Sequence, residues 1–211
     1  MKLFLASEAK HPDTIAKLES YIGGFGGKSI AYVPTASNGE QKYGVWKEES
    51  PTWKLINNSG AKATAIELED YKNSSVIKQF NNKDLIWFAG GMPGYLMYWI
   101  RRCELDKALP EILAKGSIFI GSSAGSMVCS KTLELTEWYI GENEIGSGII
   151  PGLGLVDFEI YPHYEDTLYE EIKSKFKGNK IYLLKNGEEI VVEDNKVTVS
   201  GEERILENST P

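Results

Sequence analysis

The chain has 211 residues, of which 42% are hydrophobic and 25% charged, so it resembles an ordinary globular protein with enough chain for one well-buried domain. Its formal net charge of −7 disfavours a nucleic-acid partner, because an acidic surface repels phosphate backbones. No stretch approaches the roughly 20 apolar residues of a membrane span, so no membrane partner is expected. The two cysteines, Cys103 and Cys129, are too few for a disulfide framework, and we expect buried thiols in a cytoplasmic protein.

Short apolar runs alternate with amphipathic segments along the first part of the chain. The expected strands are Leu3–Ala6, Ser29–Val33, Ala63–Leu68, Asp84–Phe88 and Ser117–Ile120. Four helical segments are expected. The first begins at Pro12, the second includes Val45, Trp46, Trp53 and Ile56, and the third includes Val76, Ile77 and Phe80. The fourth runs from Leu96 to Leu113, with a break near Leu105 to Pro110. This alternation predicts an α/β fold, in which a mostly parallel sheet is sandwiched by helices.

The pattern changes in the last third of the chain. Ile181–Leu184, Ile190–Val192 and Val197–Val199 are expected to be short strands, separated by the turn sequences Asn186-Gly187 and Asp194-Asn195. These turns predict antiparallel hairpins added to the edge of the sheet. Because neither a repeat nor a linker is evident, residues 1–211 are expected to form a single domain.

The segment Gly121-Ser122-Ser123-Ala124-Gly125 follows an apolar strand and precedes residues compatible with a helix. This is the setting of a G-x-S-x-G nucleophile elbow, whose sharp turn requires small residues at its ends. The central residue, Ser123, is the predicted nucleophile, and Ser122 is an off-centre rival. A tight turn without any chemistry is the structural alternative.

A serine nucleophile needs a base, and the sequence offers only two histidines, His11 and His163. His11 precedes Pro12 and is expected to cap a helix or face solvent. His163 follows the apolar run Phe158-Glu159-Ile160-Tyr161-Pro162, which is expected to be a strand. Since active sites of open α/β sheets gather at the carboxyl ends of strands, His163 is the predicted general base.

An oxyanion formed on attack by Ser123 needs backbone N–H donors. Ala124 offers one, because its N–H lies at the start of the helix that follows the elbow. The sequence Phe88-Ala89-Gly90-Gly91 closes an earlier strand, and its glycines would allow close approach to a reacting carbonyl. Gly91 is therefore the second predicted donor, although a plain loop after a strand would have the same composition.

The glycine pair Gly90-Gly91, the elbow, the stretch Gly152-Leu153-Gly154-Leu155 and the dipeptide Pro162-His163 together resemble the peptidase E family of serine peptidases. These aspartyl dipeptidases are related to cyanophycinases, and the resemblance covers nearly the whole chain. It implies a fold similar to class I glutamine amidotransferases, with serine in place of cysteine. It also implies catalysis by Ser123 and His163, a small peptide substrate such as an Asp-X dipeptide, and no metal or organic cofactor.

Two departures from the family pattern affect these expectations. Family members commonly carry Gly-Gly-Asn-Thr where this chain has Gly90-Gly91-Met92-Pro93, which puts specificity for aspartate in doubt. The third triad residue is also open. The resemblance places an acid near Trp138, so Glu137 is the predicted residue. Glu134, Glu142 and Asp166 are the alternative candidates for this position.

Two other functions and one assembly state stay open. An α/β-hydrolase esterase would share the elbow, but that fold usually needs a longer chain and a histidine nearer the C-terminus. A non-catalytic protein that binds peptides or small molecules could keep the same fold after losing its activity. A homodimer is also left open.

Overall fold

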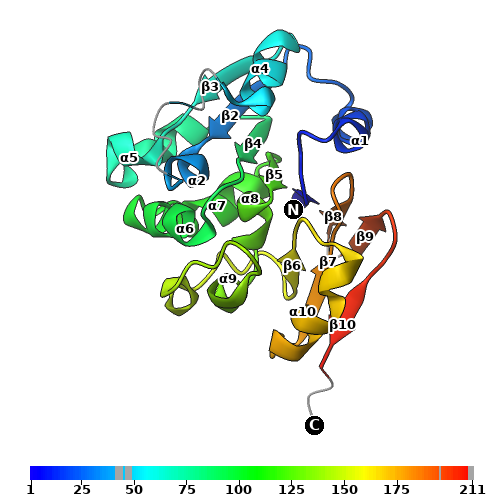
Figure 1. The fold of residues 1–211 in the computed structure, drawn as a ribbon. Coiled ribbons are helices and arrows are strands. Elements are labelled where there is room, and N and C mark those ends of the chain that lie inside the picture. Colours follow the sequence, from blue (N-terminus) through cyan, green and yellow to red (C-terminus); the bar gives the residue numbers. More distant parts are fainter. Residues whose placement is uncertain (41–44, 46–48, 195, 209–211) are drawn as a thin grey trace.

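The computed structural model describes residues 1–40, 45, 49–194 and 196–208. Its larger sheet has seven strands in the order β3-β2-β4-β5-β1-β8-β9 (Figure 1). Their bounds are β1 Lys2–Ala6, β2 Ser29–Val33, β3 Lys62–Ala65, β4 Leu85–Phe88, β5 Ile118–Ser122, β8 Glu189–Glu193 and β9 Lys196–Ser200. The first five are parallel to one another, whereas β8 is antiparallel to β1 and β9 is antiparallel to β8. The predicted α/β class is confirmed.

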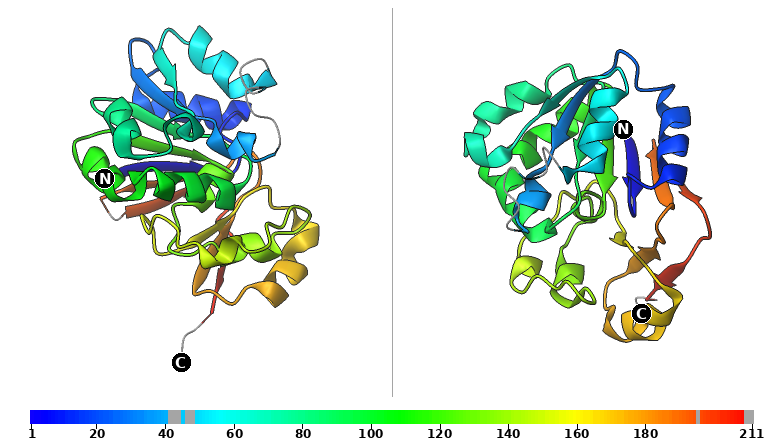
Figure 2. Two further views of the ribbon diagram at one scale, coloured as in Figure 1. Left: turned by 90° about the vertical axis from the view of Figure 1, so that its left-hand side faces the viewer. Right: turned by 45° about the horizontal axis from the view of Figure 1, so that its top comes forward.

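Helices cover both faces of this sheet (Figure 2). The helices are α1 Pro12–Ile22, α2 Thr35–Asn38, α4 Pro51–Asn58, α5 Leu68–Tyr71, α6 Pro93–Arg102, α7 Leu105–Ala114, α8 Ala124–Met127, α9 Glu134–Trp138 and α10 Tyr169–Lys175, with 3₁₀ turns η1 Ser74–Phe80, η2 Ser147–Ile149 and η3 Asp166–Leu168. Alternate strand residues point to opposite faces. On one face Phe4 and Trp87 pack with Leu18 of α1, and on the other Leu5 and Phe88 pack with α6 and α7.

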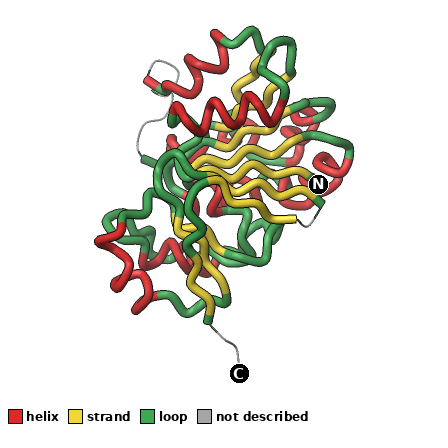
Figure 3. The backbone as a smooth tube through the Cα atoms, turned by 90° about the vertical axis from the view of Figure 1, so that its right-hand side faces the viewer, coloured by secondary structure: helices red, strands yellow, loops and turns green. Residues whose placement is uncertain are grey.

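A second sheet of three strands lies apart from the first (Figure 3). It contains β6 Glu159–Tyr161, β7 Lys180–Leu183 and β10 Ile205–Glu207, in the order β10-β7-β6. The sequence prediction was therefore wrong for Ile181–Leu184: this strand pairs in parallel with β6 and not with β8. The chain crosses from one sheet to the other at Asn186-Gly187, so this dipeptide closes no hairpin.

Smaller differences concern element bounds. The break expected near Leu105 to Pro110 lies at Cys103 and Glu104, between α6 and α7, and Pro110 is accommodated inside α7. The strand expected at Ala63–Leu68 ends at Ala65. Trp46 and Asn195, which belonged to an expected helix and an expected turn, lie outside the described residues.

In the described part of the chain, none of the helices has both the length and the apolar character needed to cross a membrane.

Candidate active site

Ser123 stands on a sharp turn between β5 and α8. Its backbone angles are φ 48° and ψ −110°, a region that a residue with a side chain adopts only when its surroundings enforce it. The Ser123 N–H donates to the carbonyl of Ala6 at 3.0 Å, which fixes the turn against β1. A Cβ atom on Gly121 would lie 2.7 Å from the Gly125 backbone, and one on Gly125 would lie 2.4 Å from the Phe88 carbonyl oxygen. The sequence therefore places glycine where no larger residue fits.

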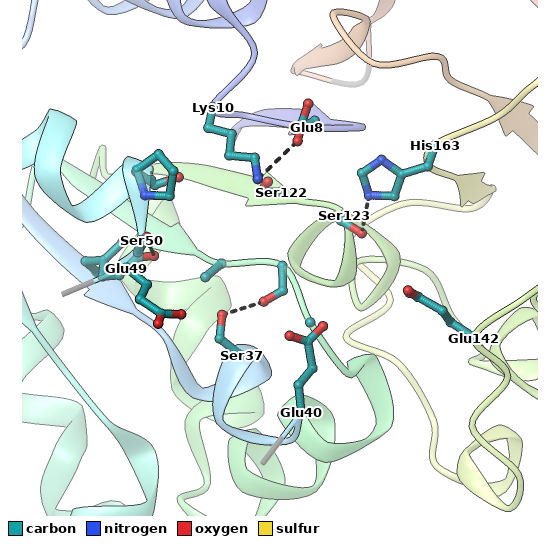
Figure 4. Close-up of a pocket in the computed structure, with 16 residues that line it drawn as sticks. Glu8, Lys10, Ser37, Glu40, Glu49, Ser50, Ser122, Ser123, Glu142 and His163 are labelled. Atoms are coloured by element: carbon teal, nitrogen blue, oxygen red, sulfur yellow. Dashed lines mark hydrogen bonds and ion pairs between the residues drawn. The ribbon is translucent and has the colours of Figure 1, made fainter. Parts of the chain in front are cut away.

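The Ser123 hydroxyl opens into a cavity of about 420 Å³ at the carboxyl edge of the parallel strands (Figure 4). The strands β4, β5 and β1 all end at this edge, as their parallel registers require. The described residues around the cavity are Glu8, Lys10, Tyr32, Ser37, Glu40, Glu49, Ser50, Pro51, Thr52, Ala89, Gly90, Gly91, Ser122, Ser123, Glu142 and His163. Cavities of this size suit small ligands.

The structure brings His163 to Ser123. The Nε2 atom of His163 lies 3.1 Å from the Ser123 hydroxyl oxygen, which is hydrogen-bonding distance (Figure 4). His163 follows β6, so it reaches the cavity from the smaller sheet and not from the edge of the large sheet, where the sequence analysis had placed it. Its φ of 53° is also in the left-handed region. Two strained residues thus meet at one contact.

The other ring nitrogen of His163 faces an amide. Nδ1 lies 2.6 Å from the Oδ1 atom of Asn186. An amide oxygen accepts a hydrogen bond, so this contact favours the tautomer with its proton on Nδ1 and leaves Nε2 free to accept the serine proton.

Ser7, the residue after β1, links the backbone of His163 to the Asn186 side chain. Its hydroxyl accepts the His163 N–H at 2.8 Å and donates to Asn186 Oδ1 at 3.2 Å. Ser7 is fully buried. With its one proton directed to Oδ1, this hydroxyl favours the amide orientation that presents oxygen to the imidazole.

The antiparallel pairing of β8 places Asn186 at the active-site edge. Glu189, the first residue of β8, pairs with Ala6, the last residue of β1, so the segment before β8 starts beside the cavity. Helix α1 holds this segment in place, because Lys17 Nζ donates to the Gly187 carbonyl at 2.9 Å.

Gly91 lines the cavity, and a Cβ atom on neighbouring Gly90 would lie 3.3 Å from the Cβ of Ser123. The end of β4 therefore lies directly against the elbow. Among the described residues, neither the Gly91 N–H nor the Ala124 N–H has a hydrogen-bond acceptor. Both predicted donors are thus unoccupied, and Gly91 shares the cavity with the Ser123 hydroxyl.

Comparison with known proteins agrees with this geometry. The model of Peptidase family S51 matches residues 3–200. The chain belongs to peptidase family S51. The resemblance to peptidase E is therefore confirmed at the level of the family, and the chain is a serine-type peptidase.

Relatives and solved structures extend the same finding. The protein named uncharacterized peptidase Lmo0363, from Listeria monocytogenes, is 26% identical over 201 residues, which cover 92% of this chain and 96% of that protein. Uncharacterized peptidase PM1590 from Pasteurella multocida is 24% identical over 176 residues, or 82% of each chain. A crystal structure of a protein provisionally described as a peptidase E, also from Listeria monocytogenes, superposes with a TM-score of 0.77 at 23% identity, covering 94% of this chain and 97% of that one. The crystal structure of a peptidase from an acI-B1 actinobacterium superposes with a TM-score of 0.66 at 19% identity, covering 99% of this chain and 95% of that one. The two structures show that the fold is shared.

The structure does not place Glu137 of this S51 peptidase beside His163, which corrects the sequence prediction. The carboxylate of Glu137 accepts the N–H groups of Gly146 and Gly148 at 3.0 and 2.8 Å, so it closes the loop after α9. The rival Asp166 pairs with Lys185 at 2.7 Å. Glu134 lies near Glu159, and its charge adds to the effect of burial in raising the pKa of the Glu159 carboxyl. Of the four acids, only Glu142 lines the cavity.

The two residues that competed with Ser123 and His163 both have structural contacts in the S51 peptidase. The Ser122 hydroxyl is buried and accepts the Ala9 N–H at 3.0 Å, which holds the loop after β1. His11 is the N-cap of α1, as expected, and its side chain accepts the Asp13 N–H. A Cβ atom on Gly187 would lie 2.9 Å from the His11 ring, so His11 also packs against the segment that carries Asn186.

Sequence reasoning missed Asn186 and Ser7. Asn186 was assigned to a turn because Asn-Gly is a strong hairpin signal, yet the same dipeptide also suits a connection between two sheets. Ser7 follows the first strand at the carboxyl edge, and this position was the one available signal that its side chain reaches the site.

Tyr139 holds the backbone next to His163 in place. Its hydroxyl donates to the carbonyl of Pro162, the residue before His163, at 2.8 Å, and its ring stacks on Tyr161 with centroids 4.7 Å apart. Burial, and then the nearby Tyr161 and Glu142, raise the pKa of Tyr139, so its hydroxyl keeps its proton and remains a donor.

No group of three or more His, Cys, Asp or Glu side chains in the described ranges is arranged to hold a metal ion. The two cysteines are buried free thiols.

Proposed function

We propose that this S51 peptidase cleaves short peptides through an acyl-enzyme formed on Ser123, with His163 as general base and acid. The observation that carries the proposal is the 3.1 Å contact between His163 Nε2 and the Ser123 hydroxyl, on a strained turn that opens into a cavity. A positioned base within hydrogen-bond reach of the nucleophile is the first requirement for this chemistry.

In the first half-reaction, His163 Nε2 takes the Ser123 proton as the serine oxygen attacks the peptide carbonyl carbon. The N–H groups of Gly91 and Ala124 donate hydrogen bonds to the resulting oxyanion, and the amine leaves with the proton from His163. In the second half-reaction, His163 takes a proton from water as the water oxygen attacks the acyl carbon. His163 then returns this proton to the Ser123 oxygen as the ester bond breaks and the carboxylic acid is released.

Asn186 holds the imidazole in this scheme. Its Oδ1 accepts the Nδ1–H of His163, so it takes the orienting role that an acid has in Ser-His-Asp enzymes. An amide in this position also occurs in Cys-His-Asn proteases, so the role does not require a carboxylate. Asn186 is a positioning residue, because it acts on the reaction only through His163.

Labelling with a fluorophosphonate probe tests the nucleophile. We expect labelling of the wild type, none of Ser123→Ala, and retained labelling of Ser122→Ala, the matched control at the adjacent serine. Labelling that survives in Ser123→Ala, or an unlabelled wild type, would overturn the proposal and favour a binding role for the same fold.

The class of substrate has a test of its own. The family resemblance offers Asp-X dipeptides as one candidate substrate. Hydrolysis of p-nitrophenyl esters alone, with no cleavage of any dipeptide or aminoacyl anilide, would instead support an esterase.

A further inference from the structure

The cavity beside Ser123 is strongly acidic. Four carboxylate side chains and one lysine lie among the described residues around it: Glu8, Glu40, Glu49, Glu142 and Lys10. Lys10 Nζ lies 3.2 Å from a Glu8 carboxylate oxygen, so these two charges offset each other. Glu49 and Glu142 give the cavity a negative field, and low-dielectric walls strengthen such a field.

Glu49 and Glu142 are available to bind a cation, because both are exposed and neither forms an ion pair within the described part of the chain. Figure 4 shows the Glu142 carboxylate directed toward the side of the cavity where Ser123 lies. Glu49 enters from the opposite side, next to Ser50 at the start of α4, and Glu40 also points inward. A substrate that reaches Ser123 therefore passes between negative charges.

Two hydroxyl groups at the cavity that could bind an acidic side chain already form hydrogen bonds within the protein. The Ser37 hydroxyl donates to the Gly90 carbonyl at 2.9 Å, and the Ser50 hydroxyl accepts the Trp53 N–H and lies 3.2 Å from the Tyr32 hydroxyl. Lys10, the one lysine among the described residues that line the cavity, is paired with Glu8. An aspartyl side chain would meet negative charge here, whereas a lysyl or arginyl side chain would be attracted.

We propose that the S51 peptidase prefers peptides whose N-terminal residue, on the acyl side of the cleaved bond, is lysine or arginine. This inference rests on the proposed function, since it takes Ser123 as the reacting atom. The α-amine is close to the reacting carbonyl, so Glu142 on the Ser123 side of the cavity is the residue assigned to it. Glu49, across the cavity, is assigned to the cationic side chain.

Matched aminoacyl p-nitroanilides test the side-chain preference. Lysine and norleucine have nearly the same shape and differ in charge, and aspartate reverses the charge. We expect kcat/KM for the lysyl substrate to exceed that for the norleucyl substrate by about 2–5-fold, the range of one partly solvated charge pair, with the aspartyl substrate slowest. Added salt should reduce the ratio, because it screens exposed charges.

Two variants test which carboxylate binds the substrate side chain and which binds the α-amine. Glu49→Gln should lower the lysine-to-norleucine ratio by about 2–5-fold, and Glu142→Gln should reduce discrimination between free and N-acetylated lysyl substrates by a similar factor. Glu111→Gln is the control, because Glu111 lies on α7 and pairs with Lys115 outside the cavity. It should leave both ratios unchanged.

The outcomes separate the two proposals. An enzyme that is labelled by the fluorophosphonate at Ser123, yet cleaves the aspartyl or norleucyl substrate as well as the lysyl one, would overturn the charge preference and leave the mechanism standing. An enzyme that is not labelled and cleaves none of these substrates would overturn the proposed function itself.

Discussion

His163 Nδ1 lies 2.6 Å from the Oδ1 atom of Asn186, which is twenty-three residues further along the chain on the connection between the two sheets. The imidazole of this S51 peptidase is thus hydrogen-bonded to a neutral amide and not to an acid. An amide fixes the tautomer and the ring orientation, but it adds no charge to stabilise the imidazolium that the proposed mechanism would form.

Replacing Asn186 should therefore change the reaction in two distinct ways. Asn186→Ala removes the orienting contact and is expected to lower kcat by about 10–100-fold. Asn186→Asp keeps an acceptor and adds a charge, so activity should be retained and the acidic limb of the pH–rate profile should move to higher pH, since a carboxylate favours the protonated ring. Steady-state rates across pH measure both effects.

The control for this pair is Asn57→Ala, at an exposed position on α4 away from the cavity. It should match the wild type. If Asn186→Ala retained kcat within about two-fold of the wild type, the contact would have no role in general-base catalysis.

Glu137→Ala separates the structural reading of that residue from the catalytic one. Its carboxylate holds the N–H groups of Gly146 and Gly148, so the free energy of unfolding should fall by about 1–2 kcal/mol. The kcat of the folded enzyme should stay within about three-fold of the wild type, because the group at His163 Nδ1 is Asn186 and not Glu137. Denaturant unfolding and active-site titration measure the two quantities. A loss of kcat as large as that of Asn186→Ala would restore Glu137 as the third member of the triad.

Gly91→Ala is expected to lower turnover by displacing the backbone at the edge of the cavity. Gly91 has φ 129°, and a Cβ atom there would lie 2.3 Å from the Ala36 carbonyl oxygen, so the backbone must shift. A displaced Gly91 N–H would cost about 10²–10³ in turnover if it serves as an oxyanion donor.

Gly116→Ala is the matched control, because Gly116 also has a positive φ, of 112°, but nothing lies within 4 Å of its added Cβ. Both variants should lose some stability from backbone strain, and only Gly91→Ala should lose kcat in the folded fraction. Equal kcat in the two folded variants would exclude the Gly91 N–H from the oxyanion site.

Glu159 makes stability depend on pH. Burial, and then the charge of Glu134, raise the pKa of its carboxyl to about 7. The folded state therefore holds a proton that the unfolded chain releases near pH 4–5, so this contribution to stability is complete at low pH and is lost as the pH rises through about 7. Glu159→Gln should stabilise the protein at pH 8 by about 1–3 kcal/mol and have little effect at pH 4.

Unfolding curves of Glu159→Gln at several pH values provide the measurement. Glu19→Gln, at an exposed position on α1, should leave the pH dependence unchanged. An identical pH dependence in the wild type and Glu159→Gln would show that Glu159 ionises as readily in the folded protein as in the unfolded chain.

The parts of the site that the sequence determined are those fixed by neighbouring residues. Gly121 and Gly125 identified the turn at Ser123, because a bend this tight admits no Cβ atom at either position. The alternation of apolar runs gave the parallel sheet, since buried parallel strands need apolar residues on both faces. His163 could be chosen because the chain has only one other histidine.

The partner of His163 Nδ1 was decided by tertiary structure alone. Strand β7 joins β6 in the smaller sheet, while β8 pairs with β1 in the larger one, and the residues between them cross at the cavity. Strand pairing of this kind depends on contacts between distant segments, so no local pattern near Asn186 or Glu137 distinguished the residue that faces the imidazole from the one that closes a loop. The sequence could single out Ser123 and His163, and only the folded chain could show that an amide is hydrogen-bonded to the imidazole.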